Sequence, residues 1–252
     1  MRNLRRAAIF LAAIFIAAAL FSQTDKDGIT VGDDKQPKAE ASLAAAIEEA
    51  EDNSVRPDTI LRLTETDFQE VAKKLGVEVA AIKAVVDIEA GPTHQGFAAP
   101  GQPLVNFDLT MFRKFAAKRG VNLSKYSKSH SPVFSPSRGS QSRAYNRVNS
   151  ARTINPNAAI EGTFWGMFQI GGFNYDKCGT SSLEEFETLM SRSERDQLDM
   201  FANFITSTGL VKYLRSHDWA SFARGYNGPG YAARNYHTRM ASAYARHKAK
   251  SK

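Results

Sequence analysis

The chain has 252 residues, of which 42% are hydrophobic and 23% charged, as is ordinary for a globular protein with one fair-sized domain and additional segments. Its one cysteine, Cys178, excludes an intrachain disulfide framework. The net charge of +7 suits a protein that works against an anionic surface, such as a bacterial envelope, nucleic acid or acidic lipid.

The N-terminal segment carries the pattern of an export signal. Residues 2–6 include three arginines, and residues 7–21 form an unbroken apolar run. This run is long for the core of a signal peptide and short for a membrane-spanning helix, which needs about 20 residues. We expect residues 1–21 to be a signal peptide cleaved after Ala19 or, alternatively, an uncleaved anchor in the inner membrane. In both cases the remaining chain is expected in the periplasm or cell envelope.

Residues 22–59 are polar, contain glycine and proline and lack aromatic residues, which predicts a flexible linker. The folded domain is expected at 60–252. Its patterns predict a mainly α fold of the α+β kind, with at most a small sheet near 97–108 and 131–155. Residues 121–143, rich in serine, lysine and proline, are expected to form a long loop. Helices are expected at 66–75, 80–90, 109–119, 145–159 with a break at Pro156, 182–190, 194–207, 210–215, 219–224 and 231–246. The first of these begins with a pattern that resembles a capping box, residues 66–69, and Gly76 ends it.

The helix expected at 80–90 ends at a carboxylate. Ile82, Val85 and Glu89 are spaced by three and four residues, so they share one stripe of the helix. Gly91 suits a left-handed helix end, and Pro92 cannot continue the helix. A half-buried glutamate at this position loses hydration, so its pKa should rise toward that of a general acid. The alternative is an ordinary solvated surface residue.

Two later segments carry unusual glycine and aromatic patterns. Residues 164–175 read Phe-Trp-Gly-Met-Phe-Gln-Ile-Gly-Gly-Phe-Asn-Tyr, and residues 224–231 read Arg-Gly-Tyr-Asn-Gly-Pro-Gly-Tyr. Together with the Glu-Ala-Gly segment at 89–91 and Gly-Phe at 96–97, they occur in the order seen in lysozyme-like enzymes. The chain resembles most closely the N-acetylmuramidase family of phage and prophage endolysins, over about residues 66–246.

The resemblance implies an enzyme that hydrolyses the β-1,4 bond between N-acetylmuramic acid and N-acetylglucosamine in peptidoglycan. Glu89 matches the catalytic acid of the family, in agreement with its expected pKa. The expected partner is the glycan strand rather than nucleic acid, and the expected protein is a monomer without a cofactor. A lytic transglycosylase and a non-catalytic wall-binding protein remain as alternatives.

The second carboxylate of the reaction has two candidates, Asp108 and Glu161, because the chain departs from the family pattern around both. Asp108 stands where the family often has an acidic residue after a Leu-Phe pair, and Glu161 precedes the tryptophan, where small residues are usual. Their structural alternatives are a fixed carboxylate and a helix-surface charge, respectively. Gly171 likewise stands where the family often has methionine.

A polar amide beside aromatic rings suits the binding of N-acetyl groups and sugar faces. The candidate substrate-binding residues are Gln169, Tyr226, Asn227, Phe97 and Trp165. Gln169 could instead tie a turn together, Tyr226 could belong to the core, and Asn227 could serve the geometry of its turn.

Other kinds of site lack their residue patterns. The five histidines show no paired ligand spacing, and one cysteine cannot build a zinc site, so no metal is expected. The chain also lacks a glycine-rich phosphate motif and the Gly-x-Ser-x-Gly turn of serine hydrolases.

Overall fold

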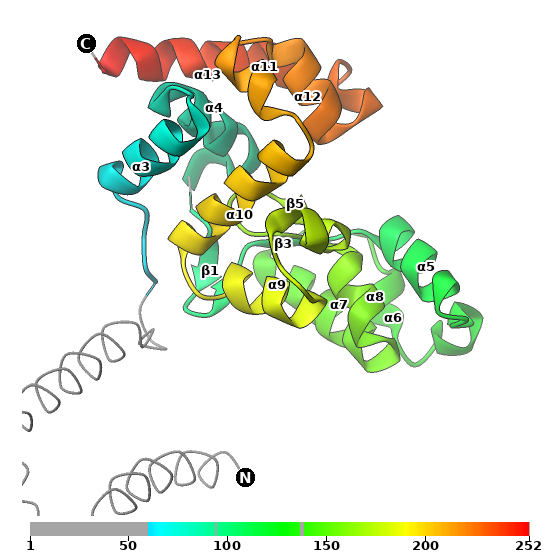
Figure 1. Ribbon diagram of the computed structural model, residues 1–252. Helices are drawn as coiled ribbons and strands as arrows, with labels where there is room; N and C mark the ends of the chain where they lie inside the picture. The colour runs from blue at the N-terminus through cyan, green and yellow to red at the C-terminus, as the bar shows by residue number, and fades with distance from the viewer. Residues whose placement is uncertain (1–59, 94, 137–138, 252) are drawn as a thin grey trace, which may run out of the picture. The chain divides into compact units, whose positions relative to one another are not determined.

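Helices dominate the computed structural model, which describes residues 60–93, 95–136 and 139–251 (Figure 1). The mainly α fold with small sheets is confirmed. The predicted signal segment and linker lie outside the described residues. Within the described ranges, no helix is both long and apolar enough to cross a bilayer. The α-helices are α3 (Glu65–Leu75), α4 (Val79–Glu89), α5 (Leu109–Lys118), α6 (Ser131–Phe134), α7 (Gln141–Ile154), α8 (Pro156–Glu161), α9 (Leu183–Met190), α10 (Glu194–Ser207), α11 (Val211–Arg215), α12 (Trp219–Asn227) and α13 (Tyr236–Lys250).

Short 3-10 helices and strands connect these helices. The 3-10 helices are η1 (Gly91–Thr93), η2 (Leu123–Tyr126), η3 (Gly172–Cys178) and η4 (Pro229–Tyr231). The strands are β1 (Phe97–Ala99), β2 (Gln102–Pro103), β3 (Val105–Phe107), β4 (Thr163–Trp165) and β5 (Ile170–Gly171). Strands β1 and β2 form an antiparallel pair, and β3, β4 and β5 form an antiparallel sheet in that order.

The sheet expected near 97–108 is present, but the strands expected at 131–155 were wrong, because this stretch is helical. Helix α7 begins at the end of the predicted loop, where the Ser140 side chain accepts a hydrogen bond from the backbone N–H of Arg143. Val148 and Ala151, three residues apart, are both fully buried. As predicted, Pro156 divides the segment, since it stands at the first position of α8.

The start of α3 also differs from the prediction, which began the helix at Thr66. The capping box is formed instead by Thr64 and Asp67. The Thr64 hydroxyl accepts from the Asp67 backbone N–H at 3.3 Å, and the Thr64 backbone N–H donates to the Asp67 carboxylate at 2.7 Å. At its other end, α3 closes as predicted on Gly76, which has a left-handed φ of 64°.

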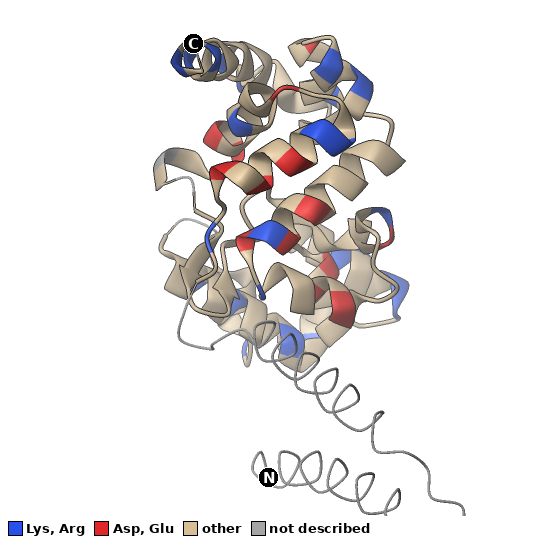
Figure 2. Ribbon diagram, turned by 60° about the vertical axis from the view of Figure 1, so that its left-hand side comes forward, with Lys and Arg blue, Asp and Glu red and all other residues tan. Residues whose placement is uncertain are grey.

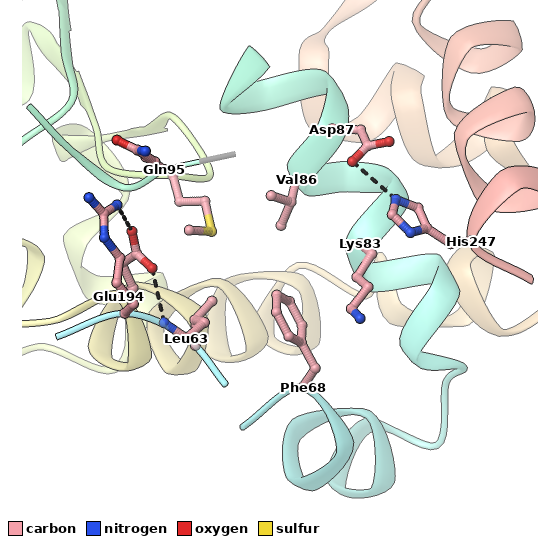
Figure 3. A pocket seen from close by; sticks show the side chains of 10 residues that line it. Leu63, Phe68, Lys83, Val86, Asp87, Gln95, Glu194 and His247 are labelled. Carbon is pink, nitrogen blue, oxygen red and sulfur yellow. Dashed lines mark hydrogen bonds and ion pairs between the residues drawn. The ribbon is translucent and has the colours of Figure 1, made fainter. Parts of the chain in front are cut away.

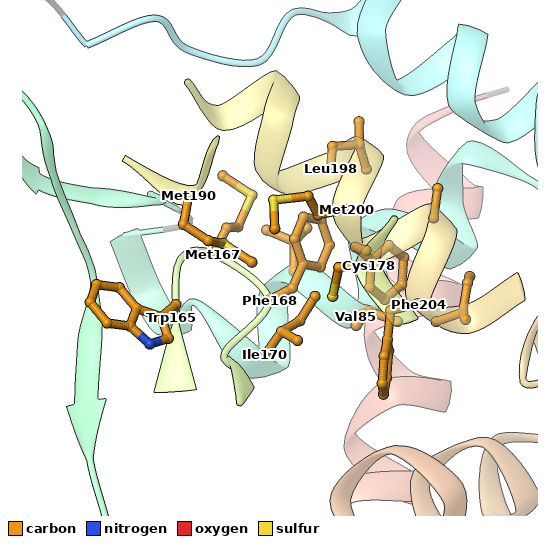
Figure 4. Packing of buried hydrophobic residues seen from close by; sticks show 14 of the residues in the cluster. Val85, Trp165, Met167, Phe168, Ile170, Cys178, Met190, Leu198, Met200 and Phe204 are labelled. Carbon is orange, nitrogen blue, oxygen red and sulfur yellow. The ribbon is translucent and has the colours of Figure 1, made fainter. Parts of the chain in front are cut away.

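The core lies around α10, whose apolar positions follow the helical period (Figure 4). Phe201 of α10 stacks on Phe168 with ring centroids 4.2 Å apart. Cys178, at the end of η3, is 1% exposed in the same cluster. The segment around Trp165 and Met167 therefore belongs to the same core cluster as the apolar face of α10.

Helix α4 is packed along α13, and α12 contacts α13 next to it (Figure 1). Ile82 and Val85 are fully buried, which confirms the predicted apolar stripe of α4. The helix stops where the sequence indicated, with Gly91 at a left-handed φ of 72°. This stop brings Glu89 to the end of a buried helix face.

Acidic and basic residues lie interspersed over the middle of the folded domain, whereas α13 carries basic residues only (Figure 2). Arg195 of α10 is an example, because its guanidinium pairs with Asp67 and Glu70 of α3 and with Asp199 of its own helix. The pairs with Asp67 and Glu70 join α3 to α10, and each of the three pairs contributes little free energy because it is accessible to solvent.

Candidate active site

A cleft of about 730 Å³ opens at the end of α4. Its lining residues come from α4, α12 and the start of α13 on one side of the domain, and from β3 and the helices α5, α6 and α7 on the other side (Figure 1). The cleft is lined by Ile88, Glu89, Asn106, Phe107, Asp108, Leu109, Thr110, Phe134, Ser135, Pro136, Arg147, Phe164, Gln169, Tyr226, Asn227, Arg234 and Tyr236. Its volume lies in the range of sites that bind small organic ligands.

Glu89 lies in this cleft as a half-buried carboxyl group. Burial away from water raises its pKa from the ordinary 4.5 to about 7. Two neighbours act in the opposite direction: the Asn227 side chain, whose Nδ2 donates to Glu89 Oε1 at 2.8 Å, and the positive charge of Arg239. The result is a carboxyl group that holds its proton near neutral pH, as a general acid requires.

Tyr226 and Asn227 form the last turn of α12. The Tyr226 hydroxyl donates to the backbone oxygen of Phe168 at 2.6 Å, and its ring stacks on Phe222. Burial, reinforced by the negative charge of Glu89, raises the Tyr226 pKa well above its usual value. Tyr226 therefore stays a neutral donor that ties α12 to the turn after β4.

That turn, residues 166–169, has an unusual backbone. Gln169 has a φ of 47° and Gly166 a φ of 71°, and the Gln169 side-chain Nε2 donates to the Gly166 oxygen at 2.8 Å. A Cβ at Gly166 would approach the Gln197 side chain to 2.7 Å, so the glycine is needed for space as well as for φ. Gln169 thus ties the turn together and also faces the cleft.

Asp108 lies on the wall opposite Glu89 and caps α5. Its Oδ1 accepts from the backbone N–H of Met111 at 2.9 Å. The neighbouring guanidinium of Arg147 donates to the Phe107 oxygen at 3.1 Å and interacts electrostatically with Asp108. A carboxylate beside a fixed cation is therefore available across the cleft from Glu89.

The remaining sequence candidates do not line the cleft. Glu161 forms an ion pair with Arg119 at the end of α8. Phe97 and Trp165 are 3% and 1% exposed, and the Trp165 Nε1 donates to the Ile160 oxygen at 3.1 Å. The structure brings together Glu89, Asp108, Gln169, Tyr226 and Asn227, and it leaves Glu161, Phe97 and Trp165 outside this group.

Several cleft residues were not foreseen. Arg147 comes from the middle of α7, and Arg234 and Tyr236 come from the start of α13. Their local sequence has no motif, although Arg234 and Tyr236 closely follow the glycine-rich 225–230 run. Arg147 is 6% exposed. A charged residue at a position that the helical period places in the core was therefore the feature of the sequence that could have identified it.

A buried polar network that supports the turn was also missed. Gln197 Oε1 accepts from the Met167 N–H at 2.7 Å, and Gln197 Nε2 donates to the Met190 oxygen at 2.8 Å. Glu194, one turn earlier in α10, accepts from the Gly96 N–H at 2.8 Å. Helix α10 therefore fixes the position of the turn that carries Gln169.

A second pocket, of about 360 Å³, lies beside another face of α4 (Figure 3). Val86, Asp87 and Lys83 of α4 line it, and His247 Nε2 of α13 is 3.1 Å from an Asp87 oxygen. The pocket is separate from the residues around Glu89. In the described ranges, no group of three or more His, Cys, Asp or Glu side chains is placed to hold a metal ion.

Among the described residues, the cleft holds one carboxyl group of raised pKa, as an enzyme that uses acid catalysis requires. The N-acetylmuramidase family model matches residues 78–248, so the chain belongs to this family. A comparison with curated proteins gives no match. Among solved structures, the chain is similar to the endolysin of Burkholderia AP3 phage, with 32% identity, a TM-score of 0.63, and coverage of 76% of this chain and 72% of that one. The protein is a peptidoglycan glycosidase.

Proposed function

We propose that the protein cleaves the β-1,4 bond between N-acetylmuramic acid and N-acetylglucosamine, with Glu89 as the general acid. The observation that carries this proposal is the Glu89 carboxyl, whose pKa is raised to about 7 in a cleft large enough for sugars. An ordinary glutamate would have lost its proton at neutral pH and could not protonate a leaving oxygen.

In this mechanism, the Glu89 proton passes to the glycosidic oxygen while the bond from that oxygen to the anomeric carbon breaks. The bonding electrons leave with the oxygen, and positive charge develops on the sugar ring. The Asp108 carboxylate on the opposite wall stabilises this charge, and water then completes hydrolysis. Asn227 keeps the Glu89 carboxyl oriented through the bond to Oε1.

Replacement of Glu89 by glutamine tests the acid. Glu89→Gln keeps the shape of the side chain and the acceptor for Asn227 but cannot donate a proton. We expect clearing of purified cell walls, followed by turbidity, to slow by about 10²–10⁴-fold. A variant that clears walls as fast as the parent would show that Glu89 is not the acid.

Product analysis distinguishes hydrolysis from the alternative chemistry of a lytic transglycosylase. We expect mass spectrometry of the released muropeptides to give reducing N-acetylmuramic acid ends, one water heavier than the anhydro ends that a transglycosylase forms. Anhydro products would reassign the reaction and leave Glu89 as its acid.

The second carboxylate is assigned to Asp108 rather than Glu161, because Asp108 lines the cleft and Glu161 pairs with Arg119 outside it. Asp108→Asn removes the charge and retains a good N-cap for α5, so folding is preserved. We expect it to lower the wall-clearing rate at least tenfold, with Glu161→Gln as the comparison. A large loss in Glu161→Gln alone would reverse the assignment.

For the biological role, we propose an endolysin-type lysis enzyme that reaches the periplasm through residues 1–21 and acts as a monomer. The structural likeness to a phage endolysin supports the role. N-terminal sequencing of the exported protein tests the route: a start at Leu20 indicates cleavage, and an intact N-terminus indicates an anchor. Size-exclusion chromatography tests the oligomeric state.

A further inference from the structure

One wall of the cleft is positively charged at the start of α13. Arg234 lines the cleft, its side chain is exposed, and it forms no ion pair with any residue that the structure describes. Many other cations are paired, such as Arg62 with Glu194 and Arg152 with Glu187. An unpaired arginine in a substrate cleft is available to an anionic part of the substrate.

A second arginine, Arg239, lies behind Tyr236 and does not line the cleft itself. The Arg239 guanidinium is 5.7 Å from the ring centroid of Tyr236, which itself lines the cleft. Arg239 is exposed, and its charge reaches the Glu89 carboxyl. Arg234, Tyr236 and Arg239 therefore form one surface next to the proposed acid, and we call it the α13 wall.

The backbone of this wall adds to its positive character. Asn235, which precedes α13, has a left-handed φ of 55°, and its side chain makes no capping hydrogen bond. The first N–H groups of this 15-residue helix thus lack a side-chain cap, and the positive end of the helix dipole lies at the α13 wall.

The opposite wall does not neutralise this charge. Arg147 is 6% exposed, lines the cleft, and has a buried Nε without a hydrogen-bond partner among the described residues. The acidic residues of the cleft are Glu89, which holds its proton near neutral pH, and Asp108. Cations therefore outnumber ionised carboxylates in the site while Glu89 is in its acid form.

The sugars of peptidoglycan carry no net charge, because the lactyl group of muramic acid is bound in an amide to the peptide stem. The carboxylates of the polymer belong to the stems. We propose that the α13 wall binds a stem carboxylate through Arg234 and Arg239, so that the enzyme selects peptide-bearing glycan over bare glycan. This inference rests on the proposed muramidase activity and names the part of the substrate that the wall recognises.

The test compares two substrates made from the same purified sacculi. One keeps its stems. The other is stripped of its stems by an amidase, and the lactyl carboxylates that this hydrolysis frees are then converted to methylamides, so that the glycan is bare and uncharged. The kcat/KM on each gives a preference ratio for the full-length parent, Arg234→Gln, Arg239→Gln and the double variant. Arg234→Lys tests rescue by a retained charge. Arg113→Gln is the matched control, because Arg113 of α5 is exposed and does not line the cleft.

We expect the parent to prefer peptide-bearing glycan. The preference ratio of the double variant should be about tenfold lower, mainly because its KM for peptide-bearing glycan is higher. Arg234→Lys should restore part of it, and Arg113→Gln should leave it unchanged. Raising the salt concentration should weaken the preference of the parent and of Arg113→Gln and should change that of the double variant little.

Three results would overturn the inference: a parent without preference, a double variant with the parental ratio, or equal losses on both substrates. Thermal unfolding of each variant identifies any folding defect. A lower fraction of active protein reduces kcat/KM on both substrates equally, so it does not change the preference ratio. Failure here is distinguishable from failure of the proposed function, since Glu89→Gln must be inactive on both substrates whether or not the wall binds stems.

Discussion

Glu89 is the residue on which the pH dependence of the enzyme depends. Its pKa of about 7 means that the proton-donating form declines above neutral pH. Well below pH 7, Glu89 is fully protonated, and we expect it to cause no change of kcat/KM with pH. Well above pH 7, we expect kcat/KM to fall tenfold per pH unit. A pH-rate profile on soluble glycan fragments measures this limb, and a fall centred near pH 4.5 would contradict the assignment.

Asn227 adjusts this pKa, because its Nδ2 donates to the carboxylate and so favours the ionised form. Removal of that donor in Asn227→Ala should raise the Glu89 pKa further and move the alkaline limb to higher pH, even where the maximal rate falls. The control is Asn203→Ala, because Asn203 donates to the backbone oxygen of Cys178 and does not line the cleft. An unshifted limb in Asn227→Ala would argue against the role.

Glu89 should also make stability depend on pH. A carboxyl whose pKa is 4.5 in the unfolded chain and about 7 in the folded one favours folding below pH 4.5, and this contribution is lost as the pH rises through 7. The difference corresponds to roughly 3 kcal/mol. Glu89→Gln cannot ionise and therefore does not lose this contribution. The free energy of unfolding of the variant minus that of the parent should therefore increase from pH 4 to pH 8. Urea denaturation at both pH values measures it, and a constant difference would refute it.

At the scale of elements, the N-terminus of α3 gives a sharp comparison between two threonines. Thr64 makes the capping bonds with Asp67, whereas Thr66 is an exposed position within the helix. We expect Thr64→Ala to lower the free energy of unfolding by about 1 kcal/mol. Thr66→Ala should change it by a few tenths or stabilise slightly, because alanine is the better helix former. Equal losses would place the cap elsewhere.

Several elements could be predicted because their signals are local. The period of apolar residues, Gly76 and Pro156 fixed α3, α4, α8 and α10 closely, since each signal acts within one or two turns. The cap of α3 was predicted two residues too late because the sequence offers two similar patterns. Thr64 stands three residues before Asp67, and Thr66 stands three residues before Gln69. The stretch 131–155 was misjudged because its many polar residues obscured the apolar face that α7 buries.

The same limit applies to the site. Glu89, Gln169, Tyr226 and Asn227 stand in recognisable local motifs, and the structure gathers them in one cleft. Arg147, Arg234 and the Gln197 network depend on contacts between distant segments, as between Gln197 and Met167. Trp165 stands in the most distinctive motif but packs inward, because alternate residues of β4 face opposite sides. The sequence therefore identified the segment that contains Trp165 but did not show that the Trp165 side chain points into the core.

At the scale of the whole molecule, residues 55–252 form a compact unit with its own core. We expect a truncated chain of these residues to unfold in one cooperative transition and to cleave soluble glycan fragments at the rate of the full-length protein. Circular dichroism and the fragment assay measure this. A truncated chain that is unfolded, or folded but slow on fragments, would show that residues 1–54 contribute to the domain.

Cys178 gives the folded unit a built-in reporter. Its thiol is buried, and burial raises its pKa to about 12, so almost no reactive thiolate exists at neutral pH. Alkylating reagents should therefore modify the protein only when η3 separates from α10. Because the chain has no other sulfhydryl group, the labelling rate would follow the opening of the interior directly, without any engineered probe.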